Sequence, residues 1–590
     1  MINRQQLLSD LQKLLARLEA DLLERSESSD VPEVGKTLRA EYERAKGAER
    51  TAQNYVDWRT DAITQAAAAW VLSCVFVRFL EDNRLIDPPK IAGPPGAAGD
   101  GRLERARDEY ELYFREHPKE TDREYLLAIF DELAKLPGTK DVFGEHNPVR
   151  ELPNWLSGDA AGELLGFFQK IDANTGTLIH DFTDTNWDTR FLGDLYQDLS
   201  PAARKKYALL QTPEFVEEFI LDRTLNPALD EFGLTPGATL ANGQQPTADG
   251  LFRMIDPACG SGHFLLGAFP RILDRWQRKE PGTNVRELVQ RSLNSIYGVD
   301  VNPYAVAIAR FRMLLAAMQV CSLTRLADAP GFQINLVCGD SLLHGVGEQK
   351  SFGWRDVDHA TQAEDMMELR RILRPDHYHT VVANPPYITP KDRALASAYR
   401  ERFSTCFGHY QLVVPFVERA FLLAVRGTAQ PDAAAYVGLI IANAFTRASF
   451  GQRLVERYLS ALDVTHVIDT SGAYIPGHGT PNGTPTIILF ARNRGPTSMV
   501  VRTLIGKRSE PGTPERLDNG KVWTSIVELL NRPGESTDFI DSIDTPRSRF
   551  SNQPWPLATD ETQMLKDRLA RSGATTLKNA VSAIGRSTHT

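Results

Sequence analysis

The sequence lacks the features that define several large classes of protein. Its five cysteines are odd in number and none forms a CxxC pair, so we expect neither a disulfide framework nor a zinc ribbon, but buried thiols in a reducing cytoplasm. The longest apolar run, residues 66–77, is shorter than the ~20 residues that cross a bilayer. Residues 1–25 are charged throughout, which is not the pattern of a signal peptide. We therefore predict a cytoplasmic protein with no membrane partner.

The chain has fewer basic than acidic residues. The 590 residues include 67 Lys and Arg against 76 Asp and Glu, a formal net charge of −9. Any nucleic acid would therefore be bound by a local basic surface and not by the net charge. Hydrophobic residues make up 42% of the chain and charged residues 24%, which excludes a disordered, collagen-like or coiled-coil protein.

Three regions of the chain differ in their residue patterns. Residues 1–200 read as a helical domain, with leucines at helical spacing between Leu7 and Leu22 and a more apolar helix over residues 60–80. In residues 201–500, short β-rich runs alternate with helical stretches after about residue 250. Residues 501–590 are polar and contain Pro and Ser, so we expect a linker or the start of a further region there.

Short apolar runs mark the strands of the middle region, at residues 252–255, 295–299, 334–337, 379–383, 437–441, 464–468 and 486–490. Helical stretches separate most of them. This alternation predicts an α/β fold, a Rossmann-like and largely parallel seven-stranded sheet with helices on both faces. Ligands of such sheets bind beyond the carboxyl ends of the strands, so the residues after each run are the candidates for chemistry.

A glycine-containing loop follows the first strand, with the sequence DPACGSGHF over residues 256–264. Gly260 and Gly262 allow a tight turn and a close approach of the backbone to a ligand. Leu265 stands where the third glycine of a dinucleotide fingerprint would be. The carboxylate of Asp256 suits a cationic ligand group. A carboxylate at this position would be unfavourable in a site that binds pyrophosphate.

Acidic residues also follow the second and third strands. Asp300, in the sequence YGVDVN, could accept hydrogen bonds from both ribose hydroxyls of a nucleoside. Asp340, in the sequence CGDSL, could accept one from an adenine amino group. Each acid by itself is more often a helix N-cap than a ligand, but three acids at successive strand ends favour a ligand site.

The fourth strand leads into the sequence NPPY, residues 384–387. An amino group on an aromatic ring is a poor nucleophile because its lone pair is delocalised into the ring. The side-chain oxygen of Asn384 and the carbonyl of Pro385 could each accept one N–H bond and so direct the lone pair toward an electrophile. Two prolines, Pro385 and Pro386, stiffen the loop, and Tyr387 offers a face on which the target base can stack.

NPPY behind a DPACGSG loop resembles the amino-methyltransferases that use S-adenosylmethionine, and the N6-adenine DNA methyltransferases in particular. The similarity covers residues 207–492 and includes Thr212 in an LQTPEF segment. It implies S-adenosylmethionine as cofactor, double-stranded DNA as partner and a target adenine flipped out of the duplex. The neutral acceptors of the NPPY loop require no metal.

Two shorter sequences, FLEDNRL at residues 79–85 and FLGDLY at residues 191–196, resemble the large PglX-type methyltransferases of BREX and phage-growth-limitation systems. This resemblance implies other phage-defence proteins as partners. Because such proteins continue into a target-recognition domain, residues 501–590 are expected to be a linker or the truncated start of that domain.

The motifs and the resemblance together assign a candidate site. The expected catalytic residues are Asn384, Pro385, Pro386 and Tyr387. The expected cofactor-binding residues are Thr212, Asp256, Ala258, Gly260, Gly262, Asp300, Val301, Asp340, Ser341 and Asn384. Tyr387 and Tyr474 are the expected stacking partners of the base, although Tyr474 could equally pack under its own hairpin. Basic residues after the catalytic loop could contact phosphates or form an ordinary solvated helix face: Lys391, Arg393, Arg400 and Arg402.

Other functions stay open. Methylation of a protein glutamine or of an RNA base nitrogen would use the same acceptors, since an amide nitrogen has a similarly delocalised lone pair. A partner-dependent module that senses DNA or the cofactor without turnover is a third interpretation. A cytosine-C5 mechanism is excluded because the chain has no Pro-Cys dipeptide.

Overall fold

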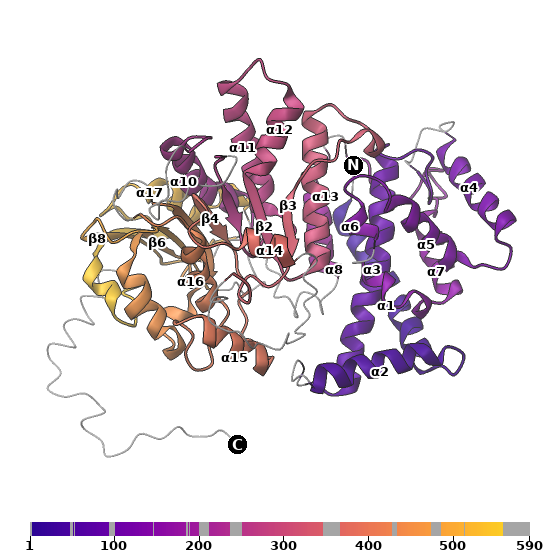
Figure 1. The fold of residues 1–590 in the computed structure, drawn as a ribbon, viewed down its shortest axis with the longest axis horizontal. Coiled ribbons are helices and arrows are strands. Elements are labelled where there is room, and N and C mark those ends of the chain that lie inside the picture. Colours follow the sequence, from indigo (N-terminus) through magenta and orange to yellow (C-terminus); the bar gives the residue numbers. More distant parts are fainter. Residues whose placement is uncertain are drawn as a thin grey trace.

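The computed structural model describes residues 3–47, 51, 53–93, 101–144, 147–184, 187, 189–199, 212–236, 250–345, 366–427, 434–473, 485–512 and 514–557. A helical region and an α/β region lie side by side, and helix α13 (Pro303–Val320) stands between them (Figure 1). The predicted fold class is confirmed: a helical N-terminal part is followed by a Rossmann-like sheet with helices on both faces.

The helical region is built on two apolar helices that the sequence predicts correctly. Helix α1 (Arg4–Glu27) buries its leucines along one face, and α3 (Tyr55–Asp82) is buried at every residue from Ala67 to Asp82. Among the described residues of this region, the other α-helices are α2 (Pro32–Gly47), α4 (Arg102–Glu116), α5 (Asp122–Leu133), α6 (Lys140–Phe143), α7 (Gly158–Phe168) and α8 (Arg190–Leu199).

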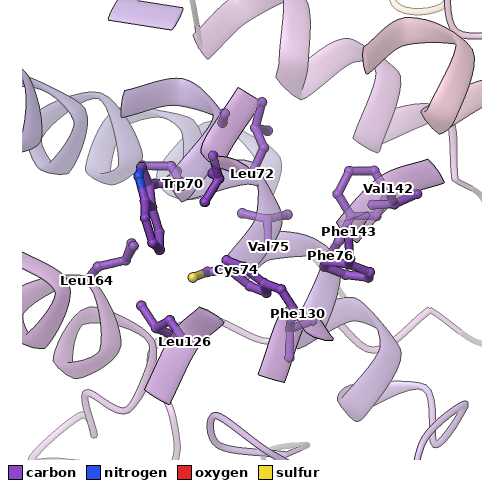
Figure 2. Close-up of a cluster of buried hydrophobic side chains, with 14 of the residues drawn as sticks. Trp70, Leu72, Cys74, Val75, Phe76, Leu126, Phe130, Val142, Phe143 and Leu164 are labelled. Atoms are coloured by element: carbon purple, nitrogen blue, oxygen red, sulfur yellow. The ribbon is translucent and has the colours of Figure 1, made fainter. Parts of the chain in front are cut away.

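Helix α3 is the core of this region. Its length and composition would allow it to cross a membrane, but 83% of its most apolar window is buried inside the protein. Figure 2 shows its side chains facing α5, α6 and α7. The ring centroids of Trp70 and Phe130 lie 5.9 Å apart, and those of Phe130 and Phe143 lie 5.6 Å apart in a stacked arrangement. Such aromatic contacts add to the stabilisation from apolar burial.

The FLEDNRL sequence forms a buried ionic network at the end of α3. Arg78 contacts the carboxylates of Glu81 and Asp82, each at 2.9 Å. Glu81 also accepts the backbone N–H groups of Ala92 at 3.0 Å and Gly93 at 2.9 Å. Because a buried charge is tolerated only when it is paired and hydrogen-bonded, this network fixes the loop after α3 against the helix.

The sheet contains all seven predicted strands: β1 (Met254–Asp256), β2 (Ile296–Asp300), β3 (Asn335–Cys338), β4 (Thr380–Ala383), β5 (Tyr436–Ala442), β6 (Asp463–Asp469) and β7 (Thr486–Arg492). The strand order is β3-β2-β1-β4-β5-β7-β6-β8-β9. The first five strands in this order pair in parallel, and β7 is antiparallel to both of its neighbours. The carboxyl ends of β1 to β4 therefore meet at one edge of the sheet.

Two further strands were not predicted, so the sheet of the described residues has nine strands and not seven. β8 (Val500–Gly506) pairs in parallel with β6, and β9 (Ile540–Pro546) pairs antiparallel with β8. The expected boundary at residue 500 thus falls at the first residue of a strand of the same sheet. β9 escaped prediction because its sequence, IDSIDTP, mixes two isoleucines with two aspartates, a serine and a threonine, so no apolar run forms. Residues 558–590 lie outside the described part of the chain.

Helices cover both faces of the sheet. One face packs against α10 (Glu214–Phe232), α11 (His263–Lys279), α12 (Val285–Asn294), α13 and α17 (Lys521–Leu529). The opposite face packs against α14 (Met366–Ile372), α15 (Arg393–Arg402) and α16 (Val413–Leu423). Near-continuous apolar runs in the central strands follow from this double coverage, because both strand faces are buried.

Helix α13 is apolar on two sides. Val306, Ala309 and Met313 belong to the core under the sheet, whereas Phe311 and Leu314 belong to the core of the helical region. Phe311 lies 5.5 Å, centroid to centroid, from Phe76 of α3. The helical and α/β regions therefore share one helix instead of meeting at a polar interface.

A buried histidine makes the fold sensitive to acid. The Nδ1 atom of His379, at the start of β4, accepts the backbone N–H of Arg253 at 3.0 Å, and its ring stacks on Phe252. Burial lowers the pKa of His379 to about 3, and the positive charges of Arg253 and His377 add to this effect. A histidine in the unfolded chain has a pKa of about 6.5. Below that pH, His379 is therefore protonated in the unfolded chain but stays neutral in the native state.

We predict that His379 destabilises the fold by up to about 1.4 kcal/mol for each pH unit as the pH falls from about 6.5 toward 3, while above pH ~6.5 it has no effect. Urea unfolding at pH 7.5, 6 and 5 measures this slope. The matched variant His379→Asn keeps an acceptor at the Nδ1 position but does not titrate, so its stability should fall less steeply. Parallel pH profiles for the two proteins would contradict the prediction.

Candidate active site

A pocket opens at the sheet edge where β1 to β4 end. Most of the residues predicted for the site line it: Thr212, Asp256, Ala258, Gly260, Asp300, Val301, Asp340, Ser341, Asn384 and Pro386. Gly262, Pro385 and Tyr387 are not among the lining residues, and Tyr474 lies outside the described residues. The fold thus brings residues from five separate segments of the sequence together in this pocket.

The three strand-end acids share one local geometry. In each, the Oδ1 atom accepts the backbone N–H two residues further on: Ala258 for Asp256 at 2.9 Å, Asn302 for Asp300 at 2.8 Å and Leu342 for Asp340 at 2.8 Å. This is the Asx turn that aspartate favours at the start of a loop. The turn and a ligand contact are compatible, because the two oxygens of a carboxylate together accept about four hydrogen bonds and the turn uses one of them.

Burial raises the pKa of all three carboxyls above the usual range of aspartate, most strongly for Asp256. The nearby negative charge of Asp300 raises the pKa of Asp256 further. A desolvated carboxylate gains most from a ligand that carries positive charge or donates hydrogen bonds. The pocket is therefore built for a cationic, donor-rich ligand and not for a phosphate.

The two glycines of the loop after β1 have different roles. Gly260 adopts φ +51°, a side chain there would meet no atom within 4 Å, and its N–H donates to Oδ2 of Asp300 at 2.9 Å. Gly262 adopts φ +85°, and a Cβ atom there would lie 3.0 Å from Cβ of Ala309 on α13. Gly260 thus leaves the pocket wall open, whereas Gly262 permits close packing of the loop on α13.

Two hydroxyl groups fix the loop after β3. Ser341 Oγ donates to the carbonyl of Pro257 at 2.7 Å, which ties this loop to the loop after β1. The hydroxyl of Tyr399 on α15 donates to Oδ2 of Asp340. Ser341 therefore braces the pocket wall, in addition to any contact with a ligand.

The Asn-Pro-Pro-Tyr loop is held at both of its ends. Asn384 Nδ2 donates to Thr212 Oγ1 at 3.1 Å, and this bond orients the carboxamide at the pocket wall. The half-buried Tyr387 donates its hydroxyl to the carbonyl of Ile440 on β5 at 3.2 Å. Burial raises the pKa of Tyr387 well above its usual value, so the phenol stays neutral. The carbonyl of Ile388 accepts the N–H of Leu412 at 2.8 Å.

Several lining residues were missed by sequence reasoning. Tyr399, Leu412 and Phe416 form an apolar wall from α15 and α16. Leu412 and Phe416 are four residues apart and so share a helix face, but that spacing also describes an ordinary core helix. No local signal separates the two cases.

Of the four basic residues after the catalytic loop, one is half-buried and three are exposed. The half-buried Arg402 donates to the carbonyl of Leu343 at 3.0 Å and so helps to fix the loop after β3. Lys391, Arg393 and Arg400 are exposed, and Arg400 donates to the carbonyl of Gly408 at 3.1 Å. Phosphate contacts stay a prediction for these three residues.

The chain thus combines a Rossmann-like sheet with a glycine loop after β1, acids after β2 and β3, and Asn-Pro-Pro-Tyr after β4. Residues 294–475 match the family described as Eco57I restriction-modification methylase.

The chain is 44% identical to the adenine-specific methyltransferase PglX of Streptomyces coelicolor over 607 residues, which cover 99% of this chain and 48% of PglX. It is 23% identical to the type II methyltransferase M.BstVI of Geobacillus stearothermophilus over 269 residues, 45% of this chain and 38% of M.BstVI. A solved DrdV–DNA complex aligns at 12% identity and a TM-score of 0.47, over 95% of this chain and 46% of that one. The chain spans about half the length of PglX.

We predict that Ser341→Ala lowers the free energy of unfolding by about 1–3 kcal/mol, because the Pro257 carbonyl loses a donor in a buried position. Thermal and urea unfolding measure this loss. Ser29→Ala, at an exposed serine between α1 and α2, serves as the control and should change stability by less than about 0.5 kcal/mol. Equal effects of the two substitutions would remove Ser341 as a brace.

Proposed function

We propose that this protein transfers a methyl group from S-adenosylmethionine to the N6 amino group of an adenine in double-stranded DNA. The observation that carries the proposal is the position of Asn384, which Thr212 holds at the wall of an acid-lined pocket. The 44% identity to an adenine-specific methyltransferase over nearly the whole chain supports the same reaction.

The pocket residues fit the proposed cofactor group by group. The desolvated carboxylates of Asp256, Asp300 and Asp340 match a ligand with ammonium, hydroxyl and amino donors. The backbone at Gly260 is open to close approach, and Leu412 and Phe416 offer apolar surface for a purine ring. When bound, S-adenosylmethionine supplies a methyl group activated by its sulfonium centre.

The Asn-Pro-Pro-Tyr loop performs the chemistry on the acceptor. The Asn384 side-chain oxygen and the Pro385 carbonyl each accept one N–H of the target amino group, and so localise the nitrogen lone pair. Pro385 and Pro386 keep both acceptors in place before the substrate arrives, which is the source of electrostatic catalysis. The ring of Tyr387, anchored through Ile440, gives the base a surface on which to stack.

A base inside a duplex cannot reach a pocket formed by loops at the edge of a sheet. The target adenine must therefore leave the stack, as in other enzymes that modify single bases. Placement of the base against these acceptors then turns the transfer into a reaction between preoriented groups. Membership of a phage-defence system and other defence proteins as partners rest on the resemblance to PglX-type methyltransferases, whereas a cytoplasmic location rests on the cysteine pattern.

The variant Asn384→Ala tests the catalytic assignment. We expect transfer of labelled methyl to unmethylated DNA to fall at least ~100-fold, since one of two preorganised acceptors is lost, while affinity for S-adenosylhomocysteine changes less than ~3-fold. Asn226→Ala, on α10 away from the pocket, is the matched control. Mass spectrometry identifies the methylated base. Cofactor binding that is lost together with activity would show that Asn384 serves the cofactor and not the acceptor.

A second substitution tests the ribose contact. Asp300→Asn should weaken binding of S-adenosylhomocysteine about 10- to 100-fold, because a charged acceptor is replaced by a neutral one. The control is Asp469→Asn at the end of β6, where the same turn forms with the N–H of Ser471 at 3.1 Å but outside the pocket. Isothermal titration calorimetry gives both affinities. Similar affinities for the two variants would exclude Asp300 from the site.

A further inference from the structure

Helix α8 of the helical region touches the glycine loop of the pocket directly. A Cβ atom added at Gly193, in the FLGDLY sequence, would lie 2.5 Å from Ser261 Oγ, 3.1 Å from Ser261 Cβ and 3.3 Å from Nη1 of Arg312. Separations this short cannot be accommodated unless a neighbour moves. Glycine at position 193 therefore allows α8 to lie against the loop without displacing the side chain of Ser261.

A buried arginine joins the same segments. Arg312, on α13, donates from Nη1 to the carbonyl of Ser261 at 2.6 Å and from Nε to Thr189 Oγ1, just before α8, at 3.1 Å. The exposed fractions are 1% for Arg312, 3% for Ser261 and 5% for Thr189. A guanidinium group is rigid and planar, so this arginine sets the distance between α8 and the loop.

The position of Ser261 controls the atoms that face the pocket. Ser261 lies between Gly260, whose N–H is bonded to Asp300, and Gly262, which packs on α13. Ser261 itself lines the pocket. A shift of its backbone would be passed on to the Gly260 N–H and to the Asp300 carboxylate, because Gly262 leaves the loop no room to move on the α13 side.

We propose that Gly193 and Arg312 are positioning residues for the cofactor site, and that the helical region sets cofactor affinity through them. This inference rests on the proposed function, because the ligand of the pocket is taken to be S-adenosylmethionine. Neither residue lines the pocket. Both act through Ser261, and substitutions at them should change cofactor binding and KM without removing any group that touches the substrates.

The first experiment compares Gly193→Ala with Gly166→Ala. Gly166 lies on α7 of the same region, and a Cβ atom there would meet no atom within 4 Å. Calorimetric titration with S-adenosylhomocysteine should show a dissociation constant at least ~10-fold higher for Gly193→Ala, because overpacking displaces the loop. Gly166→Ala should bind like the wild type. The KM for S-adenosylmethionine should rise by a similar factor, with kcat at saturation changed less than ~3-fold.

A double variant separates this effect from general destabilisation. Ser261→Ala removes the oxygen that lies nearest to the added methyl group. Gly193→Ala combined with Ser261→Ala should therefore bind S-adenosylhomocysteine more tightly than Gly193→Ala alone, a non-additive result that distant sites do not give. Additive losses would overturn the inference.

Arg312→Lys provides an independent test if Gly193→Ala does not fold. Its control is Arg419→Lys, at a buried arginine of α16 that donates to the carbonyls of His344 and Leu373. We expect similar thermal shifts for the two, but at least ~10-fold weaker S-adenosylhomocysteine binding only for Arg312→Lys, since lysine cannot span both acceptors. Equal affinities would refute the inference alone, whereas a wild-type protein that does not bind S-adenosylhomocysteine would refute the proposed function first.

Discussion

The burial of α13 on two opposite sides is the constraint on which the rest of the structure depends. A helix in a two-layer protein usually has one apolar face, but this helix supplies Val306 and Met313 to one core and Phe311 and Leu314 to another. Its position is therefore fixed by both the sheet and the helical region. The segments that contact α13 are therefore fixed in position as well.

The pocket takes its shape from that helix. Ala309 leaves just enough room for Gly262, and Arg312 holds the carbonyl of Ser261. The neighbouring Arg310 donates to the carbonyl of Leu336 on β3, so α13 also holds the strand that precedes Asp340. The strand-end acids are desolvated because the loops that carry them are packed against neighbouring elements on the side away from the pocket. Their preference for a cationic, donor-rich ligand follows from packing as much as from sequence.

Much of this arrangement could be predicted from sequence because central parallel strands are apolar on both faces and end in residues with recognisable chemistry. Asp256, Asp300 and Asn384 were placed correctly in the pocket for that reason. The strand β9 could not be predicted, since an edge strand that contains two aspartates, a serine and a threonine among seven residues has the composition of a polar linker. The contact between Gly193 and Ser261 could not be predicted either, because the two residues are 68 positions apart in the sequence and only the fold brings them together. Gly262, which was expected at the cofactor, packs on α13, and its contact with the cofactor stays a prediction.

The shared helix also limits how the helical and α/β regions can be exchanged during evolution. Domains that meet at a polar interface can be exchanged as modules, since each keeps its own core. Here a recombination point between the helical and α/β regions would leave Phe311 and Leu314 facing a foreign surface. The two regions should therefore evolve as one unit.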